Sequence, residues 1–148
     1  MQKLSHTDAS GRASMVDVGH KPIQQRKAVA KGFISLSPAT VILIRDNLIK
    51  KGDVLSVAEY AGIMGGKKCS ELIPLAHPIM VTKLDVRAEL NENGVEMVSE
   101  VHCNGQTGVE MEALTAVSVG LLTIYDMCKA VDKNMMIGEV RLNSKEKK

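Results

Sequence analysis

Aromatic residues are scarce in this chain of 148 residues, which holds one Phe, two Tyr and no Trp. Proteins that bind single-stranded nucleic acids commonly stack the bases on aromatic side chains, so the sequence argues against that class. A strong excess of one charge is also missing, because the net charge is +2 and acidic and basic residues are interspersed. The sequence therefore carries no pronounced signal for binding nucleic acid or another polyanion.

Cysteine is rare as well, with three residues at wide spacing (Cys69, Cys103 and Cys128) and no C-x-x-C motif. An odd number at such spacing argues against a disulfide framework and against a structural zinc site. The four histidines show no metal-ligand spacing either. We therefore expect reduced cysteines, a cytoplasmic location and no metal site built from these residues. Cys128 is expected to act as a small apolar core residue.

Long hydrophobic segments are absent. The N-terminus has no apolar core of the kind found in signal peptides. The longest uncharged stretch, Ala113–Tyr125, is shorter than the about 20 residues that cross a bilayer, so we predict no membrane partner. The length predicts a single domain over residues 1–148. Its polar ends, about residues 1–14 and 143–148, are expected to be mobile.

The chain does contain a regular order of strand and helix patterns. Residues 83–90 alternate between charged and apolar side chains, as in a sheet with one wet face, and Asn93-Gly94 predicts a hairpin. Ser37-Pro38 and Asp53 are typical of helix N-termini. The predicted order is β-α-α-β-β-α-β, over Gln25–Ser35, Ala39–Asn47, Val54–Leu72, Lys83–Leu90, Val95–Cys103, a helix from Thr107, and Met135–Leu142. It predicts an α+β fold, a ferredoxin-like antiparallel sheet with helices packed on one face.

The helix predicted after the hairpin is the most informative segment. Thr107 and Glu110 have the spacing of a capping box, so the helix should begin there. The stretch Ala113–Tyr125 is apolar on nearly every face, which is typical of a buried helix. The helix from Val54 contains three glycines that we interpret as sites of close helix packing: Gly62, Gly65 and Gly66.

Charged residues stand at both ends of the buried helix. Glu110 and Glu112 diverge by roughly 200° around a helix, so both can face one ligand only if the first turn is irregular or lies at an open edge. Asp126 and Lys129 are three residues apart and share a face. Charges at the ends of a buried helix are costly unless they are paired or used. The alternatives are that Glu110 only caps the helix and that Asp126 and Lys129 form an ordinary surface ion pair.

Two further polar residues fall in predicted loops. Lys51 lies in KKGDV and His77 lies in LIPLAHP. Taken alone, Lys51 could be a solvated loop charge and His77 a structural histidine. The sequence has no G-x-x-x-x-G-K-[ST], G-x-G-x-x-G or G-x-S-x-G motif, which excludes P-loop, Rossmann and α/β-hydrolase interpretations.

A functional role for these residues is better supported because they occur together in long motifs. From Leu4 to Leu142 the chain resembles the molybdenum cofactor biosynthesis protein C family, the cyclic pyranopterin monophosphate synthases. The resemblance rests on five motifs in this order: HTDASGRASMVDV, KKGDV, AGIMGGKKCSELIPLAHP, TGVEMEALTAVSVGLLTIYDMCKA and IGEVRL. The motifs are long and cover nearly the whole chain, so a chance match is improbable.

The resemblance implies a ferredoxin-like fold and a homo-oligomer, a hexamer built from dimers. The implied reaction converts 3′,8-cyclo-7,8-dihydroguanosine 5′-triphosphate to cyclic pyranopterin monophosphate and releases pyrophosphate. The implied enzyme is a lyase that needs no cofactor, although magnesium can accompany the substrate phosphates. The alternative from another class is a non-catalytic ferredoxin-like module that senses a nucleotide or pterin, and a weaker one is a purely structural oligomer.

The family's functional residues carry over one at a time. Its catalytic aspartate and lysines match Asp126, Lys51 and Lys129. The other matches are substrate contacts, among them two basic positions near the phosphates: Leu75, Ala76, His77, Glu110, Met111, Glu112, Arg26 and Lys67. Many members have Cys where this chain has Ala76, which argues against a nucleophilic thiol at that position.

The residue types suit the implied chemistry. Lysine and aspartate with tuned pKa values can perform the proton transfers of ring opening and reclosure, and we expect burial of the helix tip to raise the pKa of Asp126. A carboxylate such as Glu112 could accept the adjacent N–H donors of a guanine-type ring. Glu112 and Asp126 stand ~21 Å apart if they lie on one helix, at 1.5 Å per residue. We therefore predict active sites at a subunit interface, with the two helix ends contributed by different protomers.

Overall fold

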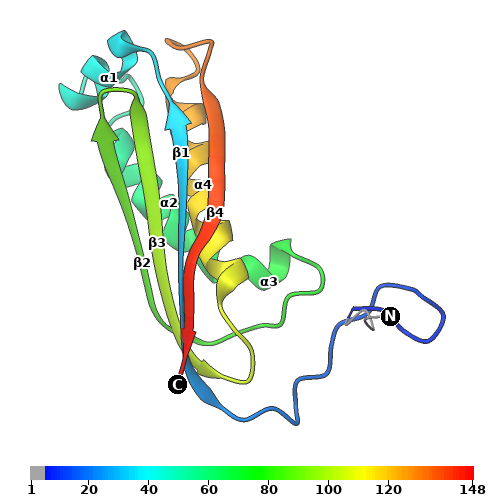
Figure 1. Ribbon diagram of the computed structural model, residues 1–148. Helices are drawn as coiled ribbons and strands as arrows, with labels where there is room; N and C mark the ends of the chain where they lie inside the picture. The colour runs from blue at the N-terminus through cyan, green and yellow to red at the C-terminus, as the bar shows by residue number, and fades with distance from the viewer. Residues whose placement is uncertain (1–5) are drawn as a thin grey trace.

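One antiparallel sheet carries helices on a single face in the computed structural model, which describes residues 6–148 (Figure 1). The strand order is β2-β3-β1-β4. The elements are β1 (Gln24–Ser35), α1 (Pro38–Arg45), α2 (Val54–Lys67), α3 (Cys69–Leu72), β2 (Val81–Asn91), β3 (Gly94–Gly105), α4 (Glu110–Cys128) and β4 (Met136–Lys147). The predicted ferredoxin-like α+β fold is confirmed.

The two central strands show why the sheet has one buried face. In β1, every second residue from Ala28 to Ile34 is buried, whereas the residues that alternate with them are partly exposed. Side chains alternate across a strand, so the buried set points toward the helices. β1 pairs with β3 on one edge and with β4 on the other, and α4 packs against both β1 and β3.

The predicted N-termini of the first two helices are confirmed. The Ser37 side chain accepts a hydrogen bond from the Thr40 N–H, and Pro38 occupies the first turn of α1. The Asp53 side chain accepts a hydrogen bond from the Ser56 N–H at the start of α2. Asp53 therefore fixes the direction in which α2 leaves the loop that carries Lys51.

Helix α2 ends earlier than predicted, at Lys67, and the short α3 follows after Lys68. The Lys68 N–H bonds to carbonyls of the last turn of α2, which closes that helix. The prediction of one helix as far as Leu72 was therefore wrong. The break turns the chain toward the loop that contains His77.

The glycines of α2 allow close contact with α4, as predicted. A Cβ added to Gly62 would lie 2.9 Å from the Ala116 carbonyl oxygen and 2.8 Å from a methyl group of Val86. A Cβ added to Gly65 would lie 2.6 Å from a methyl group of Val119. Glycine therefore sets how closely the two helices approach, and with that the position of both helices over the sheet.

We predict that Gly62→Ala lowers the free energy of unfolding. Alanine favours a helix by about 1 kcal/mol over glycine, but overpacking a core costs about 1–3 kcal/mol, and the Ala116 carbonyl belongs to a rigid helix backbone. Urea denaturation should show a net loss of about 1 kcal/mol. Gly138→Ala is the control, since a Cβ there has no neighbour within 4 Å. A Gly62→Ala protein as stable as the wild type would contradict this packing.

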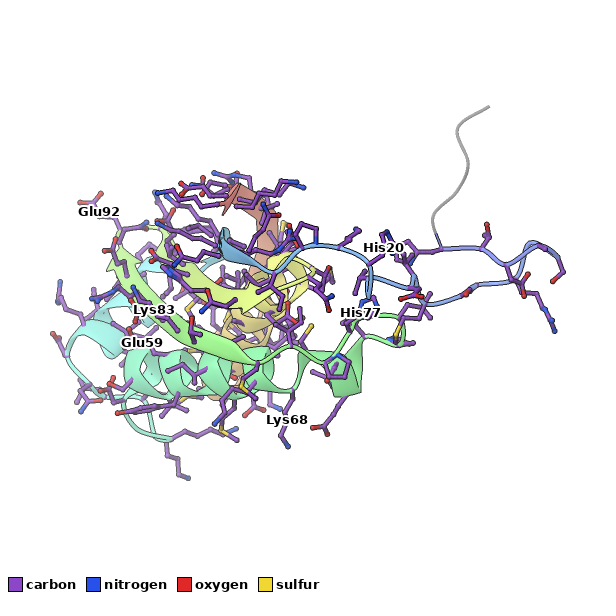
Figure 2. All side chains as sticks on the ribbon, turned by 90° about the horizontal axis from the view of Figure 1, so that it is seen from below. His20, Glu59, Lys68, His77, Lys83 and Glu92 are labelled. Atoms are coloured by element: carbon purple, nitrogen blue, oxygen red, sulfur yellow. The ribbon has the colours of Figure 1, made fainter. Side chains whose placement is uncertain are left out.

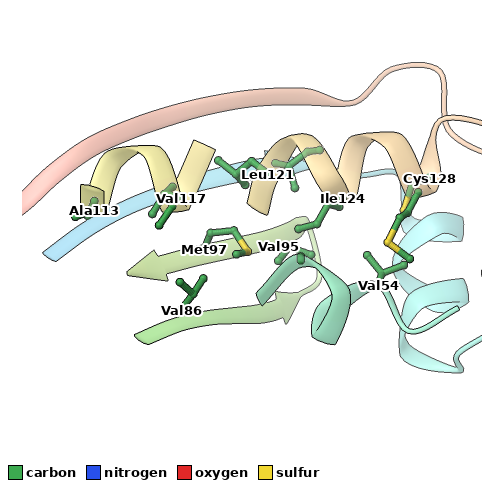
Figure 3. Close-up of a cluster of buried hydrophobic side chains, with 14 of the residues drawn as sticks. Val54, Val86, Val95, Met97, Ala113, Val117, Leu121, Ile124 and Cys128 are labelled. Atoms are coloured by element: carbon green, nitrogen blue, oxygen red, sulfur yellow. The ribbon is translucent and has the colours of Figure 1, made fainter. Parts of the chain in front are cut away.

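The core lies between the sheet and the helix pair α2 and α4 (Figure 3). Val117, Leu121 and Ile124 of α4 are fully buried, and Met97 of β3 packs beneath them. All three cysteines are buried as well, and all three are free thiols. The prediction that Cys128 acts as a small core residue is confirmed.

Helix α4 is less completely buried than its composition predicted. Leu122 is 60% exposed and Tyr125 is 39% exposed. By length and composition α4 alone, within residues 6–148, could cross a membrane, but 56% of its most apolar window is buried inside the protein. Most apolar residues of α4 therefore belong to the protein core, and Leu122 and Tyr125 remain exposed on its surface.

The C-terminal segment differs from its prediction. The last strand was predicted to end at Leu142, yet β4 continues to Lys147 and pairs with β1 as far as Arg26. The mobility expected of residues 143–148 stays a prediction. Lys148 and Gln25 exchange both backbone hydrogen bonds. The segment has no apolar pattern, but β1 offers a free edge of N–H and C=O groups, and a lysine-rich strand suits an outer edge.

The N-terminal segment runs away from the sheet in Figure 1. Of the 1–14 segment expected to be mobile, residues 1–5 lie outside the described part of the chain. Asp8 organises a turn by accepting hydrogen bonds from Ser10 and Arg12, and a bridge between Thr7 and Ala13 closes it. Mobility of this segment stays a prediction.

Candidate functional site

Three predicted catalytic residues meet at the C-terminal end of α4. Asp126 lies in the last turn of α4 and Lys129 directly follows the helix, while Lys51 comes from the loop between α1 and α2. The Lys51 Nζ lies 2.9 Å from Asp126 Oδ2, and the Lys129 Nζ lies 2.7 Å from Asp126 Oδ1. Lys51 also donates to the Asp126 backbone carbonyl at 3.2 Å. One carboxylate thus holds two ammonium groups side by side.

The charge state of this cluster differs from the prediction for Asp126. Hydrogen bonds from Lys129 and Lys51, followed by their positive charges, lower the pKa of Asp126 to about 2. Burial was expected to raise it, but the side chain is 55% exposed, so desolvation is outweighed. Asp126 is therefore a carboxylate at neutral pH. It raises the pKa of Lys129 in turn, which keeps that ammonium group protonated.

Asp132 supports this end of the helix and was missed from sequence. Its Oδ2 accepts a hydrogen bond from the Ser37 N–H at 2.9 Å, and its Oδ1 accepts one from the Asn134 N–H at 3.2 Å. Asp132 is buried, at 6% exposed. It ties the segment after Lys129 to the start of α1. A lone aspartate in a loop gives no sequence signal for a contact with a residue so distant in the chain.

Six predicted substrate contacts gather at the other end of α4. They line one cavity of about 190 Å³, together with His6: Leu75, Ala76, His77, Glu110, Met111 and Glu112. The loop between α3 and β2 supplies the first three, and the first turn of α4 supplies the others. The structure therefore brings together two motifs that are far apart in the sequence.

The two glutamates share this cavity because α4 begins at Glu110. The prediction of a capping box was wrong, since the N-cap is Val109 and no side chain caps the helix. Glu110 therefore has no preceding helical turn to confine it, and its side chain folds back over Gly108. Glu110 and Glu112 diverge around the helix, but they can face one ligand because the first turn of α4 lies at an open edge.

Glu112 is the buried carboxyl group of the site. It is 4% exposed, and burial raises its pKa, with a smaller contribution from the neighbouring charge of Glu110. The nearby Cys69 thiol opposes part of this rise in the pKa, and the Thr115 hydroxyl donates to Cys69 Sγ at 3.7 Å. Within residues 6–148 no lysine or arginine forms an ion pair with Glu112. A buried carboxyl without a cation is suited to take N–H donors from a ligand.

The two predicted phosphate contacts lie at the same end of α4. Arg26 lines a cavity of about 230 Å³ that also borders Glu110 and Lys145. Its guanidinium group donates to the carbonyl oxygens of Gly105 and Gln106. Lys67 lines a third cavity, of about 260 Å³, with Glu112. Each cation therefore borders a cavity with one of the two glutamates, Arg26 with Glu110 and Lys67 with Glu112.

We predict that Glu112→Gln raises the thermal midpoint at neutral pH. Burial raises the pKa of Glu112, so the folded protein binds this proton more tightly than the unfolded chain does. Stability is then lost as the pH rises through the raised pKa, and the neutral amide escapes this loss. The variant should gain a few degrees at pH 7 and nothing below the usual glutamate value of 4.5.

Calorimetry between pH 4 and pH 8 measures this difference. Glu92→Gln, at the exposed hairpin, is the control and should show no such pH dependence. Equal midpoints for the wild type and Glu112→Gln across the whole range would show that burial of Glu112 carries no cost.

The predicted residues thus form two groups, at opposite ends of α4. Glu112 and Asp126 are 14 residues apart along a regular helix, which corresponds to ~21 Å at 1.5 Å per residue. The three cavities at the start of α4 are bordered by none of Lys51, Asp126 and Lys129. Within the described residues there is also no group of three or more histidine, cysteine, aspartate or glutamate side chains placed to hold a metal ion.

The fold and these clusters define a ferredoxin-like α+β protein with enzyme-type sites: two lysines are paired with a carboxylate at one end of α4, and two carboxyl groups border a cavity at the other end. Residues 15–148 match the model of the MoaC family, and the chain belongs to this family. A curated relative is the cyclic pyranopterin monophosphate synthase of Parvibaculum lavamentivorans. The two are 51% identical over 146 residues, which cover 97% of this chain and 91% of the relative.

Proposed function

We propose that this chain is a cyclic pyranopterin monophosphate synthase of molybdenum cofactor biosynthesis. It is a lyase that converts 3′,8-cyclo-7,8-dihydroguanosine 5′-triphosphate to cyclic pyranopterin monophosphate and releases pyrophosphate. The observation that carries the proposal is the family match over residues 15–148, together with 51% identity to a synthase over nearly the whole chain. The working compartment of this enzyme is the cytoplasm.

In this proposal the cluster at the end of α4 carries the chemistry. Asp126 is a carboxylate and cannot supply a proton at neutral pH, so it acts as a base or holds the lysines in place. Asp126 raises the pKa of Lys129, which favours the ammonium form, so Lys129 presents a positive charge and hydrogen-bond donors to the substrate. Lys51 is hydrogen-bonded to the same carboxylate and presents a second positive charge to the substrate phosphates.

The cluster at the start of α4 binds the substrate. Glu112 accepts N–H donors of the guanine-derived ring, and Glu110 and Met111 border the same cavity. Leu75, Ala76 and His77 form its other wall, while Arg26 and Lys67 bind phosphate groups. Magnesium can accompany these phosphates, and the residues call for no other cofactor.

The two clusters complete one another in an oligomer. Reacting atoms must approach within about 3–3.5 Å, a condition that one helix of this length cannot meet at both of its ends. We therefore propose a homo-oligomer, a hexamer built from dimers, with each site shared by two protomers. The exposed Leu122 and Tyr125 on α4 are available for such a contact.

The direct test is to give the purified protein the cyclised nucleotide and to measure both pyrophosphate and the pyranopterin product. The synthase forms both in equal amounts. A nucleotide or pterin sensor would bind the compound, seen by calorimetry, and return it unchanged. Binding without product would overturn the proposed function.

We predict that Lys51→Ala lowers kcat by about 10²-fold, because the variant loses one of the two cations held by Asp126. Lys50→Ala is a matched control, since Lys50 is the adjacent exposed lysine and should keep its kcat. Steady-state kinetics up to saturation separates the two roles of Lys51. If saturating substrate restores the full rate, Lys51 only binds phosphate.

A further inference from the structure

The N-terminal segment, residues 15–22, is attached to the rim of the glutamate cavity at two points. The carbonyl oxygen of Val16 lies 2.6 Å from Nε2 of His77. The side-chain amide of Gln106 donates to the carbonyl oxygens of Gly19 and Lys21, at 2.8 and 3.1 Å. In Figure 2 His77 lies where this segment passes the loop before β2. The segment thus bridges that loop and the turn after β3.

The contact with Val16 fixes the tautomer of the neutral His77 ring. A carbonyl oxygen only accepts hydrogen bonds, so Nε2 must carry the hydrogen. In the neutral ring Nδ1 is then an acceptor with a free lone pair. No other hydrogen bond to the ring is formed by residues 6–148, and the ring borders the cavity that holds Glu110 and Glu112. Nδ1 is therefore the ring atom that remains for a ligand.

We propose that the segment 15–22 is a positioning element of the substrate site, which holds His77 through the Val16 carbonyl so that Nδ1 faces the substrate. The proposal rests on the proposed function, because it assigns His77 to substrate binding. His77 then accepts a hydrogen bond from an N–H or O–H group of the substrate. Gln106 acts through this segment and is a positioning residue.

The position of Gln106 gives the segment its second attachment. One hydrogen bond from His77 would leave residues 15–22 free to pivot, whereas two further bonds at Gly19 and Lys21 fix their direction. Gln106 in turn holds the guanidinium group of Arg26 through its backbone carbonyl, at 3.3 Å. The same turn thus anchors the segment that orients His77 and a predicted phosphate contact.

The test uses Gln106→Leu, which removes the amide donor and keeps the backbone carbonyl that binds Arg26. Nitrogen NMR on protein labelled with ¹⁵N-histidine reports the tautomer, and His77→Asn assigns the signals. We expect the wild type without substrate to show Nε2 protonated and Nδ1 unprotonated, and Gln106→Leu to show a mixture of tautomers. Its kcat/KM should fall about tenfold, since displacement of an orienting group can cost up to about 10²-fold.

Gln25→Leu is the matched control, because the exposed Gln25 side chain forms no hydrogen bond with residues 6–148, and it should retain the tautomer and kcat/KM. A second pair of variants covers the case in which Gln106→Leu fails to fold. His77→Gln keeps a donor near Nε2 but no acceptor at Nδ1, and His77→Asn does the reverse. Both should lose about tenfold or more in kcat/KM, since each lacks half of the arrangement.

A wild-type ring protonated at Nδ1, or full kcat/KM in both His77 variants, would overturn the positioning role. A wild type that shows the expected tautomer but forms no product would overturn the proposed function instead. Because the NMR measurement needs no substrate, the two failures are distinguishable.

Discussion

Asp126→Asn should reduce kcat by about 10²–10⁴-fold while the fold and the oligomer remain intact. Asp126 accepts hydrogen bonds from both Lys51 and Lys129, and its low pKa shows how strongly they favour the charged form. The Asn side chain has the same size, but it carries no charge, and an NH2 donor replaces one of the two acceptor oxygens. The two ammonium groups then lose their shared partner and repel one another, so the catalytic geometry is lost.

The fold should tolerate this change because the cluster is exposed, and ion pairs between exposed side chains contribute little to stability. The thermal midpoint and the oligomeric mass should match those of the wild type. Asp85→Asn is the control for charge, because Asp85 forms a surface ion pair with Arg87 on the edge strand β2. Near-normal turnover of Asp126→Asn would remove this carboxylate from the chemistry.

The strands and helices with strong local signals could be predicted from sequence. Ser37 and Asp53 cap their helices as expected, and the Asn93-Gly94 turn joins β2 to β3. These signals are local, since a cap or a turn depends on residues within a few positions. The glycines of α2 were also interpreted correctly. Glycine is unfavourable inside a helix, so three glycines in one helix indicate that close packing requires them.

Predictions failed where the answer depends on distant parts of the chain. The end of β4 is a strand because β1 offers it an edge, a fact that the polar residues 143–148 do not reveal. Thr107 and Glu110 have capping-box spacing, but α4 starts only at Glu110. The pKa of Asp126 was expected to rise, since the approach of Lys51 from another loop cannot be read from the spacing around Asp126.

The candidate site followed from resemblance more than from spacing. Composition alone left His77 and Lys51 as ordinary loop residues, and the long motifs gave them roles. Neither argument found Cys69, Asp132 or Gln106. Cys69 borders a cavity with Glu112, Asp132 binds the start of α1, and Gln106 holds the N-terminal segment, and in each case the partners are far apart in the sequence. Such supporting residues carry no motif of their own. Only the folded chain shows them.

Mixing two inactive proteins, Glu112→Ala and Asp126→Ala, should restore about one quarter of the wild-type activity. The two residues lie at opposite ends of α4, ~21 Å apart by helix rise, and the two cavities that Glu112 borders do not reach Asp126. If each site takes Glu112 from one protomer and Asp126 from its two-fold partner, a mixed dimer has one fully normal site and one doubly altered site. Half of the dimers are mixed after complete exchange, and half of their sites work.

The alternative arrangement gives a different number. If both residues of a site come from one chain, every site in the mixture carries a substitution and the activity stays at zero. Mass spectrometry of a tagged mixture shows whether mixed oligomers have formed. Mixed oligomers that remain inactive would therefore contradict shared sites.

A converse mixture checks the same geometry without relying on recovery. Wild-type protein mixed equally with the double variant Glu112→Ala/Asp126→Ala should keep about one quarter of its activity per total chain if sites are shared, because every mixed dimer then has two damaged sites. Sites within single chains would keep about one half. Shared sites therefore raise the activity of the first mixture, from zero to about one quarter, and lower that of the second, from about one half to about one quarter. Agreement on one quarter in both would place each active site between the start of one α4 and the end of its partner's.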